Sequence, residues 1–181
     1  MIEAIAVITT LWCVYLTKKE RILAWPIGIV SSIAYFYIFL NEKLYSDMTL
    51  QVFYVIQGLY GWYNWNKPKV FLKIKDAPFP AFWVDLILTF GVGIIIGYLL
   101  GRFTNTTQPY LDAWVACFSL LANWYLINKI VQSWLIWVCV DVLLVGIFIS
   151  RGLWFSAILY FILFLLALQG YRTWQKNIRT D

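Results

Sequence analysis

Seven apolar segments of roughly membrane-spanning length follow one another along the chain, with only short charged loops between them. They cover residues 2–17, 22–40, 44–66, 83–101, 110–128, 133–150 and 153–171. A helix of about 20 apolar residues crosses the hydrocarbon core of a bilayer, and within lipid the backbone must satisfy its own hydrogen bonds. The pattern therefore predicts an all-α integral membrane protein with seven transmembrane helices.

Composition excludes a soluble domain and several classes of site. Of the 181 residues, 62% are hydrophobic and 13% are charged, whereas a soluble domain is about 45–50% apolar and about 25% charged. The chain has no histidine, which excludes histidine-based metal sites and catalytic triads. Its three cysteines show no CxxC spacing, so we expect neither a metal site nor a cofactor. The net charge of +5 indicates membrane orientation rather than nucleic-acid binding.

The basic residues are unevenly divided between the two sets of loops. Eleven of the 14 follow the first, third, fifth and seventh segments, and the alternate loops hold only Lys43, Arg102 and Arg151. Loops rich in Lys and Arg stay in the cytoplasm. We therefore predict a multi-pass topology with the N-terminus outside and the C-terminus in the cytoplasm, which agrees with an odd number of helices.

The chain matches itself when it is shifted by 109 residues. The pairs that apolar composition explains least are tryptophans and glycines: Trp25 with Trp134, Gly61 with Gly170, and Trp65 with Trp174. The match predicts two three-helix repeats joined by a linker helix. Residues 1–66 form the first repeat, residues 67–109 a cytoplasmic loop and the linker helix, and residues 110–181 the second repeat and the cytoplasmic C-terminus.

The two predicted repeats have the same orientation in the membrane, because corresponding helices are four apart. This is a parallel repeat with its pseudo-twofold axis along the membrane normal, as in sugar carriers of the SWEET type. Such repeats usually place a substrate site between the halves, near the midplane. The alternative is a duplicated bundle without a pathway.

Asp141 lies near the centre of the sixth segment. A carboxylate at mid-bilayer costs about 3 kcal/mol or more, and such residues mark functional sites by default. No Lys or Arg lies at a similar depth in any segment, which disfavours an internal ion pair. We predict a functional role for Asp141, with a structural pairing or a protonated, hydrogen-bonded acid as the alternative.

Trp134 and Trp137 precede Asp141 at spacings that put all three side chains on one helical face. Two indoles and a carboxylate suit a flat aromatic ligand that carries positive charge, because the rings stack or make cation–π contacts and the acid balances the charge or binds hydroxyls. Trp134 fits equally well as an anchor at the membrane interface.

Amide and phenol side chains in the third and fifth segments are further candidates for ligand binding. They are Gln51, Tyr54, Gln57 and Asn123. Such groups inside a bundle bind ribose-like hydroxyls, or they hydrogen-bond to neighbouring helices. The sequence leaves both interpretations open.

Three stretches resemble the PnuC family of vitamin transporters. They are the run Tyr45–Gln51 with Tyr54 and Tyr60–Trp65 in the third segment, the Trp134-x-x-Trp137-x-x-x-Asp141 pattern in the sixth, and Gly170–Trp174 at the end of the seventh. The likeness covers nearly the whole chain, including the three-one-three layout.

The resemblance implies a carrier in the bacterial inner membrane for nicotinamide riboside, or for a related B-vitamin such as thiamine. It implies facilitated diffusion, with the product trapped by cytoplasmic phosphorylation, and a homo-oligomer, in this family a trimer. Trp134, Trp137 and Asp141 would carry over as the substrate motif, together with Gln51 and Tyr54.

Several alternatives remain open at this point. Nicotinamide riboside and thiamine both carry a cationic aromatic ring, so the face containing Asp141 suits either. Because the interiors of the segments hold no basic residue to receive a phosphate, the sequence disfavours a nucleotide. Proton-coupled symport through Asp141 is a second mechanism. An intramembrane enzyme or a purely structural subunit is a third possibility, although no nucleophile–base or metal set can be assembled.

Overall fold

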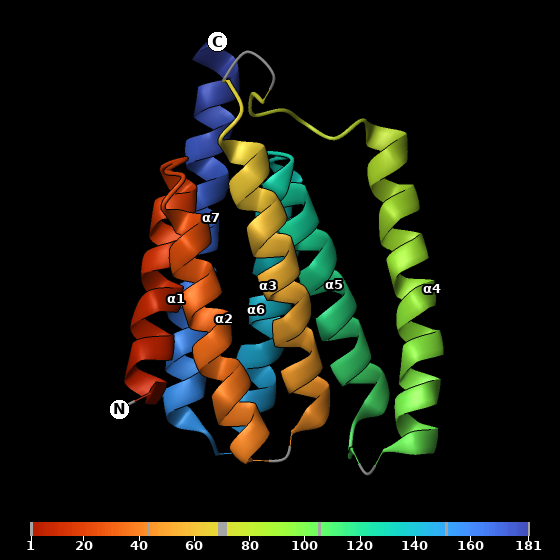
Figure 1. The fold of residues 1–181 in the computed structure, drawn as a ribbon. Helices are drawn as coiled ribbons and strands as arrows, with labels where there is room; N and C mark the ends of the chain where they lie inside the picture. The colour runs from red at the N-terminus through yellow and green to blue at the C-terminus, as the bar shows by residue number, and fades with distance from the viewer. Residues whose placement is uncertain (1, 43, 69–71, 105, 151, 181) are drawn as a thin grey trace.

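The described part of the chain folds into seven α-helices that run roughly parallel to one another (Figure 1). The computed structural model describes residues 2–42, 44–68, 72–104, 106–150 and 152–180. The helices are α1 (Ile2–Lys18), α2 (Ala24–Asn41), α3 (Tyr45–Trp65), α4 (Phe79–Phe103), α5 (Pro109–Ile127), α6 (Gln132–Ser150) and α7 (Trp154–Thr180). Five of them, α2, α4, α5, α6 and α7, are long and apolar enough to cross a membrane. The prediction of an all-α, seven-helix membrane protein is confirmed.

Two helices extend several residues beyond the apolar segments that predicted them. Helix α4 begins at Phe79, with a proline in its first turn, where proline's fixed φ suits a helix start. Helix α7 continues to Thr180, beyond the predicted end at 171. Its last turns carry Arg172, Lys176 and Arg179, so the helix continues past its apolar part.

Helices α1–α3 and α5–α7 form two groups that meet along two seams. Helix α1 packs against α7, and α3 packs against α5. Under the 109-residue shift these two seams are equivalent, since α1 corresponds to α5 and α3 to α7. Among the described helices, α4 packs against α5 alone and stands at the edge of the molecule (Figure 1).

Close packing and hydrogen bonds hold α4 to α5. Gly93 and Gly97 leave room for Trp114 and Tyr110, whose rings would lie 2.2 Å and 2.6 Å from an added Cβ. The Tyr125 hydroxyl also donates a hydrogen bond to Asp85, at 2.6 Å. Small residues that admit large neighbours are typical of membrane helix contacts.

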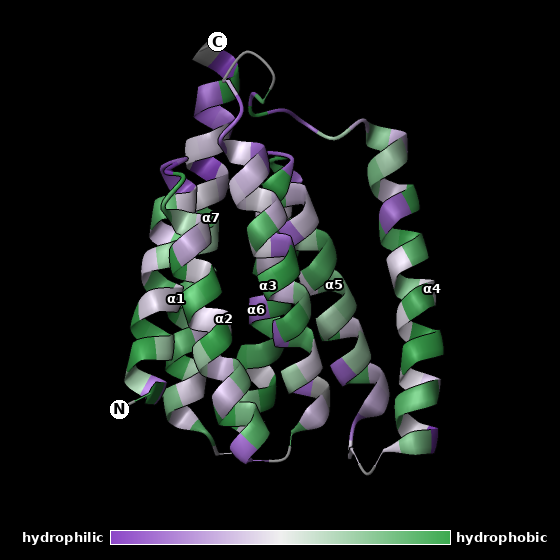
Figure 2. Ribbon diagram, viewed as in Figure 1, coloured by the Kyte–Doolittle hydropathy of each residue, from purple (hydrophilic) through white to green (hydrophobic). Residues whose placement is uncertain are grey.

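One end of the bundle holds the α1–α2, α3–α4 and α5–α6 connections together with the C-terminus, and we call it the basic end. Figure 2 shows hydrophilic residues gathered there, at the top of the view. Of the basic residues counted in the sequence, Lys43, Lys69 and Arg151 lie outside the described residues. Many of the large apolar side chains of the helices are exposed on the outside of the bundle, as lipid contact requires.

The repeat-related tryptophans and glycines make matching contacts in the two halves. Trp25 lies on Gly61 and meets the ring of Trp65 edge-to-face, at 5.4 Å. In the other half, Trp134 lies on Gly170 and meets Trp174 in the same way, also at 5.4 Å. Trp134 is 1% exposed, so it lies inside the bundle and not at the lipid interface.

Candidate functional site

A cavity of about 240 Å³ lies between the two groups of helices. Side chains from α1, α2, α3, α5, α6 and α7 line it, whereas none of its lining residues comes from α4. Six of the seven residues predicted to bind a ligand line this cavity: Gln51, Tyr54, Asn123, Trp134, Trp137 and Asp141. Residues distant in sequence are therefore gathered around one space.

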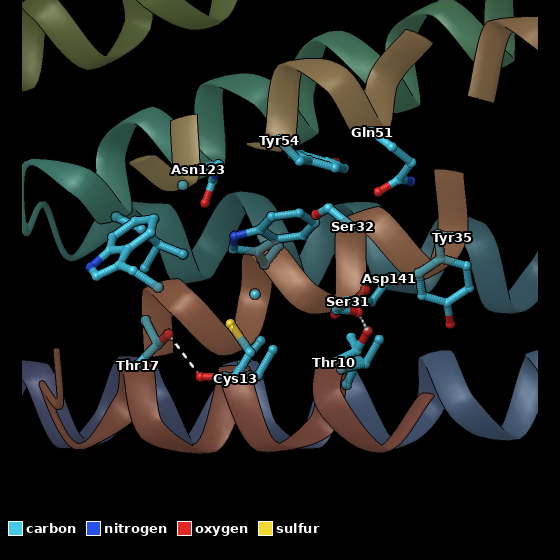
Figure 3. A pocket seen from close by; sticks show the side chains of 18 of the residues that line it. Thr10, Cys13, Thr17, Ser31, Ser32, Tyr35, Gln51, Tyr54, Asn123 and Asp141 are labelled. Atoms are coloured by element: carbon cyan, nitrogen blue, oxygen red, sulfur yellow. Dashed lines mark hydrogen bonds between the residues drawn. The ribbon is translucent and has the colours of Figure 1, made fainter. Parts of the chain in front are cut away.

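Asp141 faces the cavity at a wall made largely of hydroxyl groups. It lines the cavity together with Thr10, Ser31 and Ser32, and in the view of Figure 3 it projects close to Thr10 and Ser31. The hydroxyls of Thr10 and Ser31 lie 2.6 Å apart and link α1 to α2. Asp141 is 3% exposed, and within the described ranges no basic side chain forms an ion pair with it. A buried carboxylate without a cation is poised to receive one from a ligand.

The hydroxyl wall was missed in the sequence. Thr10, Ser31 and Ser32 belong to two short pairs of hydroxyl residues, Thr9–Thr10 and Ser31–Ser32, in apolar segments. Such residues usually bond to their own helix backbone. The repeat contained a usable signal, because the 109-residue shift aligns Ser32 with Asp141. The same shift aligns Gln51 with Tyr160, which also lines the cavity.

Tryptophans form the part of the cavity nearest the basic end. Trp25, Trp134 and Trp137 all line it. The indole nitrogens of Trp25 and Trp134 are buried without a hydrogen-bond partner among the described residues. Buried donors are rarely left unpaired, so an acceptor on a bound ligand or a water would satisfy them.

Gln57 is the predicted residue that does not line the cavity. Its amide nitrogen donates to the backbone oxygen of Leu120 at 3.1 Å, and its oxygen accepts from the Asn123 amide at 2.9 Å. Both bonds join α3 to α5. With its nitrogen engaged by Gln57, Asn123 keeps its carbonyl for the cavity, where Figure 3 shows the side chain. Gln57 thus orients a cavity residue.

The cavity is polar towards one end and aromatic towards the other. Figure 3 shows Tyr35 and Gln51 together at one side of the view, with Thr17 at the opposite side. Trp25 and Trp134 lie in the first turns of α2 and α6, near the basic end. In the described lining there is no Lys or Arg, so the cavity offers aromatic faces, hydroxyls, amides and one carboxylate.

Comparison with known proteins identifies the family. Residues 1–176 match the family described as nicotinamide mononucleotide transporter. The nicotinamide riboside transporter PnuC of Escherichia coli strain K12 is 27% identical over 207 residues, covering 98% of this chain and 86% of that protein. The riboflavin/roseoflavin transporter RibM of Streptomyces davaonensis is 26% identical over 171 residues, covering 90% of this chain and 79% of that protein.

A solved structure shares the fold. The crystal structure of the vitamin B3 transporter PnuC superimposes with a TM-score of 0.81 at 19% identity, covering 99% of this chain and 82% of that chain. This likeness extends through all seven helices, including α4 at the edge. The protein is therefore a multi-pass membrane transporter that belongs to the nicotinamide mononucleotide transporter family, with the helical architecture of PnuC.

Proposed function

We propose that the protein takes up nicotinamide riboside by facilitated diffusion and that intracellular phosphorylation traps the product. The observation that carries this proposal is the placement of Trp137 and Asp141 on one cavity between the two halves. An aromatic face and an uncompensated carboxylate together recognise a flat ring with a positive charge. The cationic pyridinium of nicotinamide riboside is such a ring.

The rest of the cavity suits a sugar attached to that ring. Hydroxyls of Thr10 and Ser32 and the amide of Gln51 line the same cavity as Asp141, and together they supply donors and acceptors for ribose hydroxyls. The carbonyl of Asn123, oriented by Gln57, is an acceptor for the carboxamide of the ligand. Trp134 and Tyr54 complete the site that we propose.

Two other ligand classes suit the cavity less well. A nucleotide brings a phosphate, and the described lining offers neither Lys nor Arg to pair with it. A flavin, as named for the relative RibM, is larger. A cavity of about 240 Å³ lies below the range of about 300–1,000 Å³ typical of drug-sized ligands. Thiamine, a smaller cationic aromatic vitamin, is the second candidate, since it meets the same chemical requirements.

The orientation that we propose places the basic end in the cytoplasm. The concentration of Lys and Arg in the loops of that end follows the positive-inside rule, which leaves the N-terminus outside. Nicotinamide riboside then enters from the opposite end, and a cytoplasmic kinase that phosphorylates it prevents its return. Proton coupling through Asp141 is the alternative mechanism, and transport assays with and without a pH gradient separate the two.

Calorimetric titration of the purified protein tests the proposed substrate. We expect saturable binding of nicotinamide riboside and weaker binding of thiamine, riboflavin and nicotinamide mononucleotide. Trp137→Ala removes a desolvated cation–π contact of about 2 kcal/mol, which weakens binding roughly 30-fold. Asp141→Asn removes a charge-assisted contact of about 1.5–3 kcal/mol and weakens binding at least about tenfold.

Matched controls lie outside the cavity. Trp154, on α7, is 62% exposed, and Asp112 is exposed in the first turn of α5. Trp154→Ala and Asp112→Asn should bind as the parent does. Parent-like binding by both Trp137→Ala and Asp141→Asn would refute the site, and tighter binding of thiamine would replace the substrate.

A further inference from the structure

Two layers of tryptophan separate the cavity from the basic end. Trp25 and Trp134 line the cavity, and Trp65 and Trp174 lie behind them. The rings of Trp65 and Trp174 approach each other to 6.2 Å across the boundary between the halves. All four side chains belong to one buried cluster. At this end the cavity is closed by side chains contributed equally by the two halves.

An ion pair lies beyond the tryptophans. The Lys129 ammonium is 2.8 Å from a Glu20 carboxylate oxygen, with side chains 9% and 28% exposed, respectively. It also lies 4.9 Å from the centre of the Trp65 ring. Asn177 donates to the other Glu20 oxygen at 3.1 Å. This is the one salt bridge found within the described ranges, and it joins the two halves.

Glu20 and Lys129 are equivalent residues of the two repeats, since they are 109 positions apart. Both have a left-handed backbone, with φ of 53° and 52°, in the turns that follow α1 and α5. The turns share their hydrogen bonds: Glu20 donates to Thr17, and Lys129 donates to Leu126. Because they are related by the repeat and contact each other, the two side chains meet at the pseudo-twofold axis.

Hydrogen bonds from the second tryptophan layer are exchanged between the halves in the same reciprocal way. The Trp65 indole donates to the backbone oxygen of Ile127 at 3.1 Å, and the Trp174 indole donates to that of Lys18 at 3.2 Å. Positions 18 and 127 are again 109 apart. Each half therefore contributes one indole hydrogen bond and one charged turn residue to the contact with the other half.

The connection between α3 and α4 fixes the turn that carries Lys129. The Lys75 amide donates to the Lys129 oxygen, and the Val131 amide donates to the Lys75 oxygen, both at 3.0 Å. The Gln132 side chain accepts from the Ala77 amide at 2.8 Å. These hydrogen bonds hold the turn that carries Lys129 in place. If the two halves separated, Lys129 would therefore move away from Glu20 together with its turn.

We propose that the Glu20–Lys129 pair and the two tryptophan layers beneath it form the gate that closes the cavity at the basic end during transport. A largely buried ion pair gains its attraction at the cost of dehydration, so its paired and hydrated states are close in free energy. Opening this end hydrates both charges and breaks the two exchanged indole bonds. The proposal rests on the transport function proposed above.

Cys13 provides a direct test because its thiol lines the cavity (Figure 3). Cys117→Ala and Cys139→Ala leave it as the single thiol. In membrane vesicles of known orientation, an impermeant methanethiosulfonate reagent is applied from the basic side. Glu20→Lys and Lys129→Glu each place like charges at the axis, and we expect labelling of Cys13 to rise at least about tenfold. Exchanging the residues, with Glu20→Lys and Lys129→Glu together, should return labelling to the parent rate.

The controls separate the gate from the binding site and from misfolding. Lys73→Glu changes an exposed lysine at the same end and should leave labelling unchanged. Glu20→Gln removes the charge without changing shape, so it should raise labelling even where a reversal fails to fold. The binding of nicotinamide riboside in detergent is measured for every variant as a control for folding. If the parent protein itself does not bind, the proposed function is wrong, whereas the labelling experiment still tests the gate. Unchanged labelling in Glu20→Gln, or raised labelling in a folded exchanged pair, would overturn the gate.

Discussion

Gly170→Ala is predicted to destabilise the protein and to deform the cavity through Trp134. An added Cβ at Gly170 would lie 2.6 Å from the Trp134 ring, which is closer than real Cβ contacts allow. Trp134 is buried between Gly170 and Trp174, so its ring must shift, and the cavity that it lines is the adjacent open space. One methyl group therefore affects both packing and ligand binding.

The magnitude follows from two opposing contributions. Overpacking a well-packed interior costs about 1–3 kcal/mol, and replacing a helical glycine by alanine returns up to about 1 kcal/mol. The net loss is about 1–2 kcal/mol, or about 2–8 °C in Tm for a chain of this size. Gly61→Ala should behave alike, because its added Cβ would lie 2.4 Å from Trp25.

Thermal unfolding in detergent, followed by calorimetric titration, measures both effects. Gly146→Ala is the matched control. Gly146 lies on α6, in the same half of the protein as Gly170, and no atom lies within 4 Å of a Cβ added there. The control should unfold at or above the parent Tm and bind nicotinamide riboside normally. A Gly170→Ala variant that unfolds no earlier than Gly146→Ala and binds normally would refute the packing argument.

Three further predictions concern the orientation of Asn123, the contact between α4 and α5, and proton coupling. Gln57→Leu should weaken the binding of nicotinamide riboside several-fold, because it releases Asn123. Gln169 is exposed, so the control Gln169→Leu should leave the affinity unchanged in the same calorimetric titration. Tyr125→Phe removes the hydrogen bond from α5 to Asp85. The free energy of unfolding should fall by about 1 kcal/mol, which lowers Tm, whereas the affinity for the ligand should change little. Under facilitated diffusion, liposomes with and without a pH gradient should accumulate nicotinamide riboside equally, and gradient-driven accumulation would establish proton coupling instead.

The helices were predictable from the sequence because lipid imposes both their length and their apolar composition. The ends were less so: α7 runs to Thr180 because a helix can continue into water after its apolar part has ended. Trp134 illustrates a deeper ambiguity, since an indole near a helix end suits the interface and the interior equally. Only its contact with Gly170 resolves its position.

The lining of the cavity was predictable where a polar residue is costly in lipid, and it was missed where the residue is common. Asp141 stands out in an apolar helix, whereas Ser31 and Thr10 do not. Gln57 and Asn123 look alike in sequence, and only the packing of α3 against α5 shows that Asn123 reaches the cavity whereas Gln57 bonds to α5.

Protection of Cys13 from alkylation tests most directly the claim that the cavity between the halves holds the vitamin. The measurement uses purified Cys117→Ala/Cys139→Ala protein and increasing nicotinamide riboside. We predict that the alkylation rate of Cys13 falls along the calorimetric binding curve, because a ligand held by Trp137 and Asp141 fills the space that the thiol faces. An unchanged alkylation rate at ligand concentrations that saturate the calorimetric signal would contradict the account.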